Sequence, residues 1–276
     1  METPFNLRVI APLTVAAIAL SLSASISADA KPDTRAQTGS DKTKAAGGKN
    51  VYGDHGDPVG WCADELETLP NGLCYIKAAA PERRTLVIFL HGMIAKNVDW
   101  QWLQERALTR QAKASHFDAV FAKAPLTPSG FIWPGTREAQ DASEQGLIDG
   151  WNEARAVLEK RNGQPYDEVF VMGFSSGAYF TSSLALRGRV KADGFAVFAG
   201  GAGSQSSPDV AQKPPVFVGV CMDDPQTAAH SRGFGSALAA RGWPHKVDEQ
   251  HVGHMFGDAH VAHAVAYLRS QKKSGS

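Results

Sequence analysis

The chain has 276 residues, of which 43% are hydrophobic and 20% charged, so it is long enough for one large globular domain. Its 28 basic residues balance its 28 acidic residues, and this neutrality excludes the strongly positive surface that nucleic-acid binding requires. We therefore expect no nucleic-acid partner.

The N-terminal segment has the pattern of an export signal. Arg8 precedes a short apolar stretch, which the small residues of "SISADA" follow. We predict a signal peptide over residues 1–30, with cleavage after Ala28 or Ala30. An uncleaved membrane anchor is the alternative, although the apolar stretch is short and serine-rich for a bilayer span. The expected location is therefore secreted or periplasmic, with no stable membrane insertion after cleavage.

Residues 31–50 contain almost no side chain that could be buried, which predicts a disordered linker. The remainder, residues 51–276, is predicted to form a single domain. The sequence does not indicate its oligomeric state.

The three cysteines suit an exported chain. Cys62 and Cys74 bracket the turn signal "PNG", so their sulfurs can meet across a small hairpin or loop, and we predict a disulfide between them. Cys221 lies in the apolar run "PVFVGVCM" and is expected to be a buried, free strand residue. Their spacing supports neither a zinc site nor a redox motif, and we expect no cofactor.

Downstream of Pro81, short apolar runs alternate with longer helical patterns. The runs are too short for typical helices, which predicts buried strands at 85–92, 117–125, 168–173, 194–201 and 215–225. Apolar residues at helical spacing predict helices over 143–161, 177–188, 227–242 and 259–270. This alternation predicts an α/β fold with a mostly parallel central sheet, helices on both faces, and the functional site at the carboxyl ends of the strands.

Ser175 lies between Gly173 and Gly177 in "VMGFSSG", where a predicted strand passes into a predicted helix. A serine at such a turn is held clear of the sheet, where its hydroxyl can attack a carbonyl carbon. The same short pattern also occurs in ordinary glycine-containing loops. The interpretation of Ser175 as a nucleophile therefore depends on finding a base and an acid elsewhere.

Two adjacent aspartates follow the strand that contains Cys221. An acid at this place can orient a catalytic histidine, or it can cap the helix that begins near Gln226. We favour Asp224 as the acid and expect Asp223 mainly to support the helix start; the reverse assignment stays open at this point.

The segment "HVGHMFGDAH" supplies candidate bases. His254 is flanked by a glycine and an apolar pair just before a helix, and we predict that it is the base, with His251 as the reserve. His260 and His263 are expected to belong to the final helix. A metal site is the alternative for the cluster, but no zinc-type carboxylate or cysteine pattern accompanies it, so we expect no metal.

Two further groups complete the predicted site. The N–H groups of Met93 and Ser176 are expected to bind an oxyanion, while His91 is expected to pack or to bond to the turn. Between the strands, "PLTPSGFIWPGTREAQDA" carries an apolar hump at residues 131–133. We interpret Phe131 and Trp133 as a substrate-binding wall; a passive crossover is the alternative.

The motifs "LVIFLHG", "VMGFSSG", "VCMDDP" and "VGHMF", in this order, resemble the α/β-hydrolase superfamily over residues 85–269. Within it, the chain is similar to compact secreted esterases of the carboxylesterase/thioesterase-like, polyhydroxybutyrate depolymerase-like and feruloyl esterase-like types. It departs from them in its His91-Gly92-Met93 turn, where a run of glycines is common.

The resemblance implies a serine hydrolase without a large lid domain. Ser175 would be the nucleophile, Asp224 the acid and His254 the base, with Met93 and Ser176 as oxyanion donors. The expected reaction is cleavage of short-chain or aryl carboxylic esters, from a small-molecule or polymeric substrate, through an acyl-enzyme. An acyltransferase or polyester depolymerase with the same triad, and a non-catalytic envelope protein of the same fold, remain alternatives.

Overall fold

A computed structural model describes residues 60–96, 98–202 and 210–273. The predicted signal peptide (1–30) and linker (31–50) lie outside the described residues, as does the beginning of the predicted domain.

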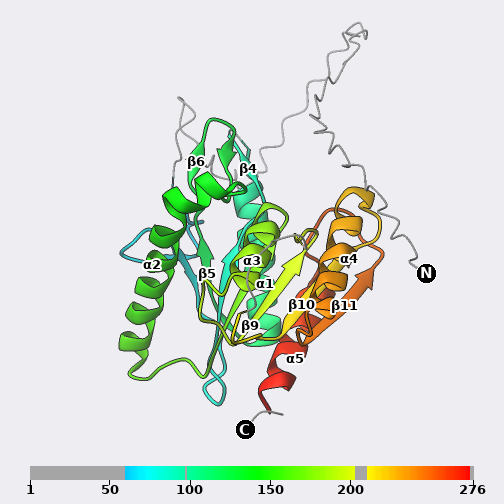
Figure 1. The fold of residues 1–276 in the computed structure, drawn as a ribbon. Helices are drawn as coiled ribbons and strands as arrows, with labels where there is room; N and C mark the ends of the chain where they lie inside the picture. Colours follow the sequence, from blue (N-terminus) through cyan, green and yellow to red (C-terminus); the bar gives the residue numbers. More distant parts are fainter. Residues whose placement is uncertain (1–59, 97, 203–209, 274–276) are drawn as a thin grey trace, which may run out of the picture. The chain divides into compact units, whose positions relative to one another are not determined.

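Within the described residues, eight strands form one sheet in the order β1-β2-β5-β3-β8-β9-β10-β11 (Figure 1). All neighbours from β5 to β11 are parallel, whereas β2 pairs antiparallel with β1 and with β5. The prediction of a mostly parallel sheet is confirmed. The strands are β1 (Glu67–Thr68), β2 (Cys74–Ile76), β3 (Thr85–Leu90), β5 (Asp118–Ala122), β8 (Glu168–Phe174), β9 (Gly194–Phe198), β10 (Val216–Cys221) and β11 (His245–Gln250).

The five predicted apolar runs are the five buried central strands. Every residue of β3, β5, β8, β9 and β10 is buried, because helices cover both faces of the sheet. The structure adds β11, which the sequence analysis did not predict. This strand forms the edge of the sheet and has no fully buried residue, so its sequence "HKVDEQ" lacks the apolar run on which the other predictions depended.

Helices lie on both faces of the sheet, as predicted. α1 packs against α5 on one face, and the other three helices lie on the opposite face (Figure 1). The helices are α1 (Trp100–Ser115), α2 (Arg137–Asn162), α3 (Ser176–Leu186), α4 (Pro225–Ala240) and α5 (Asp258–Lys273). α2 begins earlier than predicted because the Thr136 side chain caps it, accepting the Ala139 N–H at 3.3 Å.

α1 was not among the helices predicted from the sequence. The buried face of this helix contains four polar side chains, Gln101, Gln104, Glu105 and Gln111, and these hide the apolar periodicity that predicts an amphipathic helix.

A small antiparallel sheet lies beyond the carboxyl edge of the main sheet. It has the order β4-β7-β6 and consists of β4 (Ile94–Ala95), β6 (Leu126–Thr127) and β7 (Gly130–Phe131). The apolar hump at residues 131–133 thus begins in β7 of this small sheet. The Phe131 and Trp133 side chains are buried, and Phe131 packs edge-on against Trp61 with ring centroids 4.6 Å apart.

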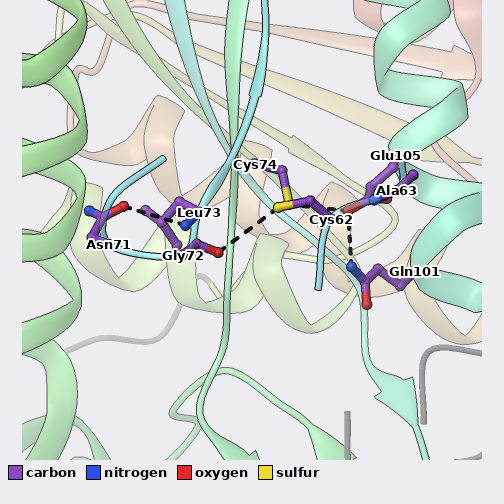
Figure 2. The surroundings of a disulfide bond; sticks show 8 residues. All are labelled: Cys62, Ala63, Asn71, Gly72, Leu73, Cys74, Gln101 and Glu105. Carbon is purple, nitrogen blue, oxygen red and sulfur yellow. Dashed lines mark hydrogen bonds between the residues drawn. A yellow bond between two sulfur atoms is a disulfide. The ribbon is translucent and has the colours of Figure 1, made fainter. Parts of the chain in front are cut away.

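The predicted disulfide joins Cys62 to Cys74, with Cα atoms 5.3 Å apart, and Cys221 is free and buried, also as predicted. Figure 2 shows that the disulfide lies beside Gln101 and Glu105 of α1. The Glu105 carboxylate accepts the Ala63 N–H at 3.0 Å, which ties the disulfide segment to this helix. Among the described residues, we found no helix that has both the length and the apolar character needed to span a membrane.

Candidate active site

Ser175 occupies a sharp turn between β8 and α3. Its backbone has φ 51° and ψ −117°, a strained conformation for a residue other than glycine. The turn also packs tightly: a Cβ on Gly173 would lie 2.3 Å from the Gly177 carbonyl oxygen, and one on Gly177 would lie 2.1 Å from the Leu90 carbonyl oxygen. Both flanking glycines are thus required by close backbone approach.

The turn places Ser175 beside His254 and Asp224, which lie far from it in the sequence. The Ser175 Oγ lies 2.9 Å from His254 Nε2, and His254 Nδ1 lies 2.6 Å from Asp224 Oδ2. The two aligned hydrogen bonds allow the imidazole to take the serine proton while the carboxylate orients the ring.

Asp224 also forms the N-cap of α4. Its side chain accepts hydrogen bonds from the N–H and the hydroxyl of Thr227. The expectation that Asp223 supports the helix start is therefore wrong, because one carboxylate both caps the helix and binds His254. Burial alone would raise the pKa of Asp224, but the hydrogen bonds from Thr227 and His254 outweigh it and lower this pKa below its usual value.

The other candidate histidines contact aspartates other than Asp224. His251 lies on the surface 3.1 Å from Asp223, and His260 is fully buried in α5, with its Nε2 3.9 Å from Asp248. His263, also in α5, lies 3.1 Å from the same Asp248 carboxylate, so His260 and His263 share one partner, which is not the partner of His251. In the described part of the chain, no group of three or more His, Cys, Asp or Glu side chains is arranged to hold a metal ion.

The backbone beside Ser175 can bind an oxyanion. α3 begins at Ser176, so the first N–H groups of this helix have no acceptor within it. Gly92 is close by, since a Cβ on it would lie 3.3 Å from the Ser175 Cβ, and Met93 follows it. His91 is fully buried, which lowers its pKa to about 4 and keeps the ring neutral; it bonds to the turn, as expected.

An apolar groove of about 560 Å³ opens on one side of Ser175. One wall is a face of α1 and the other is the segment that follows His254. Four of its apolar side chains are more than 40% exposed, an unusual concentration for a protein surface: Met93, Trp100, Leu103 and Met255. The paired side chains of Arg110 and Asp258, 2.7 Å apart, also line the groove.

A second cavity, of about 470 Å³, lies on the other side of Ser175. Trp133 and Ser176 line it together with Tyr179 and Ile132. Trp133 therefore lines the same cavity as Ser175. Phe131 does not: it lines a separate cavity, which contains none of the proposed catalytic residues.

Sequence reasoning missed the α1 side of the site. Its lining residues recur at helical spacing, which is the signal that could have identified them once the helix was recognised: Trp100, Leu103, Gln104, Ala107 and Arg110.

The sequence profile of the dienelactone hydrolase family matches residues 135–273, which is half of the chain and includes Ser175, Asp224 and His254. The chain belongs to the dienelactone hydrolase family. Its fold is that of the α/β-hydrolase superfamily, in agreement with the resemblance of its motifs.

Among curated relatives, acyl-protein thioesterase 1 of Eremothecium gossypii is 29% identical over 134 residues, which cover 44% of this chain. The match spans about half of that relative, 56% of its length. Among solved structures, esterase PE8 has a TM-score of 0.54 at 21% identity, covering 74% of this chain and 98% of that one. The carboxylesterase from Mesorhizobium loti has a TM-score of 0.52 at 18% identity, covering 77% of this chain and all of that one. At these identities the two structures establish the shared fold.

Proposed function

We propose that this member of the dienelactone hydrolase family hydrolyses carboxylic esters through an acyl-enzyme on Ser175. The observation that carries the proposal is the hydrogen-bonded series from Ser175 through His254 to Asp224, at 2.9 and 2.6 Å. A strained serine with an aligned base, beside unpaired helix N–H groups, is the arrangement that acyl transfer requires.

In the proposed mechanism each group has its own role. His254 Nε2 takes the proton as Ser175 Oγ attacks the ester carbonyl, and the N–H groups of Met93 and Ser176 stabilise the negative oxygen. His254 then gives the proton to the departing alcohol. In the second half, the same imidazole activates water, which releases the acid and restores the serine. Asp224 holds the ring in the tautomer that accepts the proton at Nε2 throughout.

The two cavities beside Ser175 suggest how an ester lies in the site. The leaving alcohol must receive a proton from His254, and His254 lines the groove along α1. We therefore place the alcohol part in this groove and the acyl part in the second cavity, against Trp133. Both volumes lie at the lower to middle range of small-molecule sites. They fit short-chain or aryl groups on either side of the ester.

The reaction is tested with a fluorophosphonate probe and with p-nitrophenyl acetate. The protein should react with both, and Ser175→Ala should abolish labelling and turnover. His254→Ala should be nearly as damaging, whereas His251→Ala, the matched control, should retain activity. Labelling that survives Ser175→Ala would contradict the assignment of the nucleophile, and the opposite ranking of the histidines would contradict that of the base.

The orientation of the ester is tested with two substrate series, one that varies the acyl chain and one that varies the alcohol. Ile132→Ala, in the second cavity, should change the preference for acyl length and leave the alcohol preference unaltered. Leu103→Ala, in the groove, should do the reverse. If Ile132→Ala changed the alcohol preference and Leu103→Ala the acyl preference, the acyl part would lie in the groove and the alcohol part in the second cavity. Hydrolysis of a polyester film but no soluble ester would change the assignment to a depolymerase, and transfer to an added alcohol would indicate an acyltransferase.

We also propose that the protein is exported after signal cleavage. The apolar N-terminal segment and the Cys62–Cys74 disulfide support this location, because disulfides persist in oxidising compartments. Mass spectrometry of the mature protein should find an N-terminus near Asp29 or Lys31, the crosslink, and a free Cys221. An intact N-terminus at Met1 would contradict the proposal.

A further inference from the structure

The turn after β3 contains two successive peptide units, and the first is held at both ends. The His91 carbonyl oxygen accepts a hydrogen bond from Trp133 Nε1 at 2.8 Å. On the opposite side of the same peptide, the Gly92 N–H donates to Gln104 Oε1 at 2.7 Å. Since a peptide unit is planar, two hydrogen bonds at its opposite edges fix its orientation.

The second peptide unit is held at one end and open at the other. Its carbonyl oxygen, that of Gly92, accepts from His91 Nδ1 at 2.5 Å, and His91 Nε2 in turn accepts the Ala124 N–H at 3.2 Å. The N–H of this unit belongs to Met93 and points away from the held carbonyl, because the peptide is trans. In the described part of the chain, it donates no hydrogen bond.

Gln104 is suited to hold such a turn. Its side chain comes from α1, is almost fully buried, and lies on the face of the helix that lines the groove. The next residue, Glu105, anchors the same turn of α1 to Ala63, beside the disulfide (Figure 2). The amide that holds Gly92 is thus attached to a helix that is itself tied to a crosslinked segment.

We propose that Gln104 is a positioning residue for the oxyanion site, which holds the Gly92 N–H so that the Met93 N–H is directed at the oxygen of the tetrahedral intermediate. The inference rests on the proposed ester hydrolysis. Gln104 itself touches neither reacting atom in this account; it acts by orienting a donor. A donor that is already oriented requires no reorganisation as the charge develops.

Gln104→Met tests the proposal, because methionine has a similar length and no oxygen acceptor. We expect kcat to fall by about 10- to 100-fold with little change in KM, since loss of one oxyanion donor lowers kcat by about 10²- to 10³-fold and displacement retains part of its effect. Gln104→Glu, which keeps an accepting oxygen, should restore most of the lost kcat. Amide hydrogen exchange of Gly92, followed by NMR, should be slow in the wild type and in Gln104→Glu and fast in Gln104→Met.

Gln101→Met is the matched control. It removes another buried glutamine amide from α1, one that donates to Glu105 at 2.9 Å and does not contact the turn. This variant should lose stability but keep kcat and the slow exchange of Gly92. If Gln104→Met does not fold, Trp133→Phe tests the other end of the same peptide, with the same expected loss of kcat.

The outcomes separate this inference from the proposed function. A wild-type protein that neither labels nor turns over esters would contradict the function, while the exchange of Gly92 would still decide whether Gln104 holds the turn. An active wild type with unchanged kcat in Gln104→Met would overturn the inference and leave the function standing. A fall in kcat that Gln101→Met reproduces would show that Gln104 acts only through the stability of α1.

Discussion

His254 Nδ1 lies 2.6 Å from Asp224 Oδ2, and the same Asp224 carboxylate caps α4. The helix start thereby holds the acid in one orientation, and the acid holds the imidazole. Asp224 thus has two roles, capping α4 and orienting His254, which the sequence had predicted for two neighbouring aspartates. Substitutions can separate these roles, because some side chains can cap a helix without carrying a charge.

Asp224→Asn should lower kcat by about three to four orders of magnitude, because the amide can stabilise the wrong tautomer of His254. Its melting temperature should stay close to that of the wild type, since asparagine caps helices as well as aspartate does. Asp224→Ala should lose activity and also about 0.5–2 kcal/mol of unfolding free energy. Steady-state kinetics and thermal unfolding check both effects. Asp223→Asn is the control and should keep its activity; a larger loss there than in Asp224→Asn would show that the wrong acid was chosen.

Ser175→Gly should be more stable than Ser175→Ala by about 1 kcal/mol, because glycine adopts the backbone angles of this turn without strain. Both variants should be inactive, so the comparison concerns stability alone. Urea denaturation measures it. The matched pair Ser176→Gly and Ser176→Ala lies one residue further on, in α3, where alanine should be the more stable. An advantage for Ser175→Ala over Ser175→Gly would mean that the turn is not strained.

Glu105 should make the protein less stable as the pH rises. Burial raises the pKa of this carboxyl from its ordinary value of 4.5 to about 8. Between these two values the folded state keeps a proton that the unfolded state releases, so the unfolding free energy falls through this window as the pH rises and is constant above it.

Glu105→Gln should remove this dependence. Its amide can still accept the Ala63 N–H, and it offers a donor to the Gln101 carbonyl oxygen, which is buried without a partner among the described residues. The variant should be more stable than the wild type at about pH 9, by a few kcal/mol, and closer to it at about pH 5. Urea denaturation at both pH values measures the difference. If the unfolding free energies of the variant and the wild type differed equally at both pH values, the raised pKa of Glu105 would be contradicted.

The Arg110–Asp258 pair should limit the length of the group that the groove accepts. Arg110 lies six residues beyond Gln104 on α1, a rise of about 9 Å, and a longer apolar chain would have to desolvate the ion pair. Arg110→Leu should therefore raise kcat/KM for esters of longer alcohols by about tenfold, the effect of roughly one to two kcal/mol of added apolar binding.

The same variant should hardly change stability, since exposed ion pairs contribute about 0–1 kcal/mol. Arg232→Leu is its control, because Arg232 forms a similar exposed pair with Glu249 away from the groove. A change in kcat/KM that is equal for short and long alcohols, or that Arg232→Leu reproduces, would show that the pair does not bound the groove.

The sequence by itself determined the central architecture and the turn at Ser175, and it narrowed the acid to Asp223 or Asp224 and the base to His254 with His251 in reserve. Buried parallel strands are covered on both faces, so they must be continuous apolar runs, and five of them were recognisable as such. The turn at Ser175 was also readable, because close backbone approach permits only glycine at positions 173 and 177. Both are local requirements, so each produces a recognisable sequence pattern within a few residues.

Only the tertiary structure decided which side chains surround the serine. The buried face of α1 carries polar residues whose partners, such as Gly92 and Ala63, come from other parts of the chain, so the apolar residues alone do not mark this face of the helix. Phe131 and Trp133 are two residues apart and both are buried aromatic residues, yet one packs edge-on against Trp61 and the other lines the same cavity as Ser175. Which cavity a side chain enters depends on contacts between elements distant in sequence, and the spacing of residues along the chain does not contain that information.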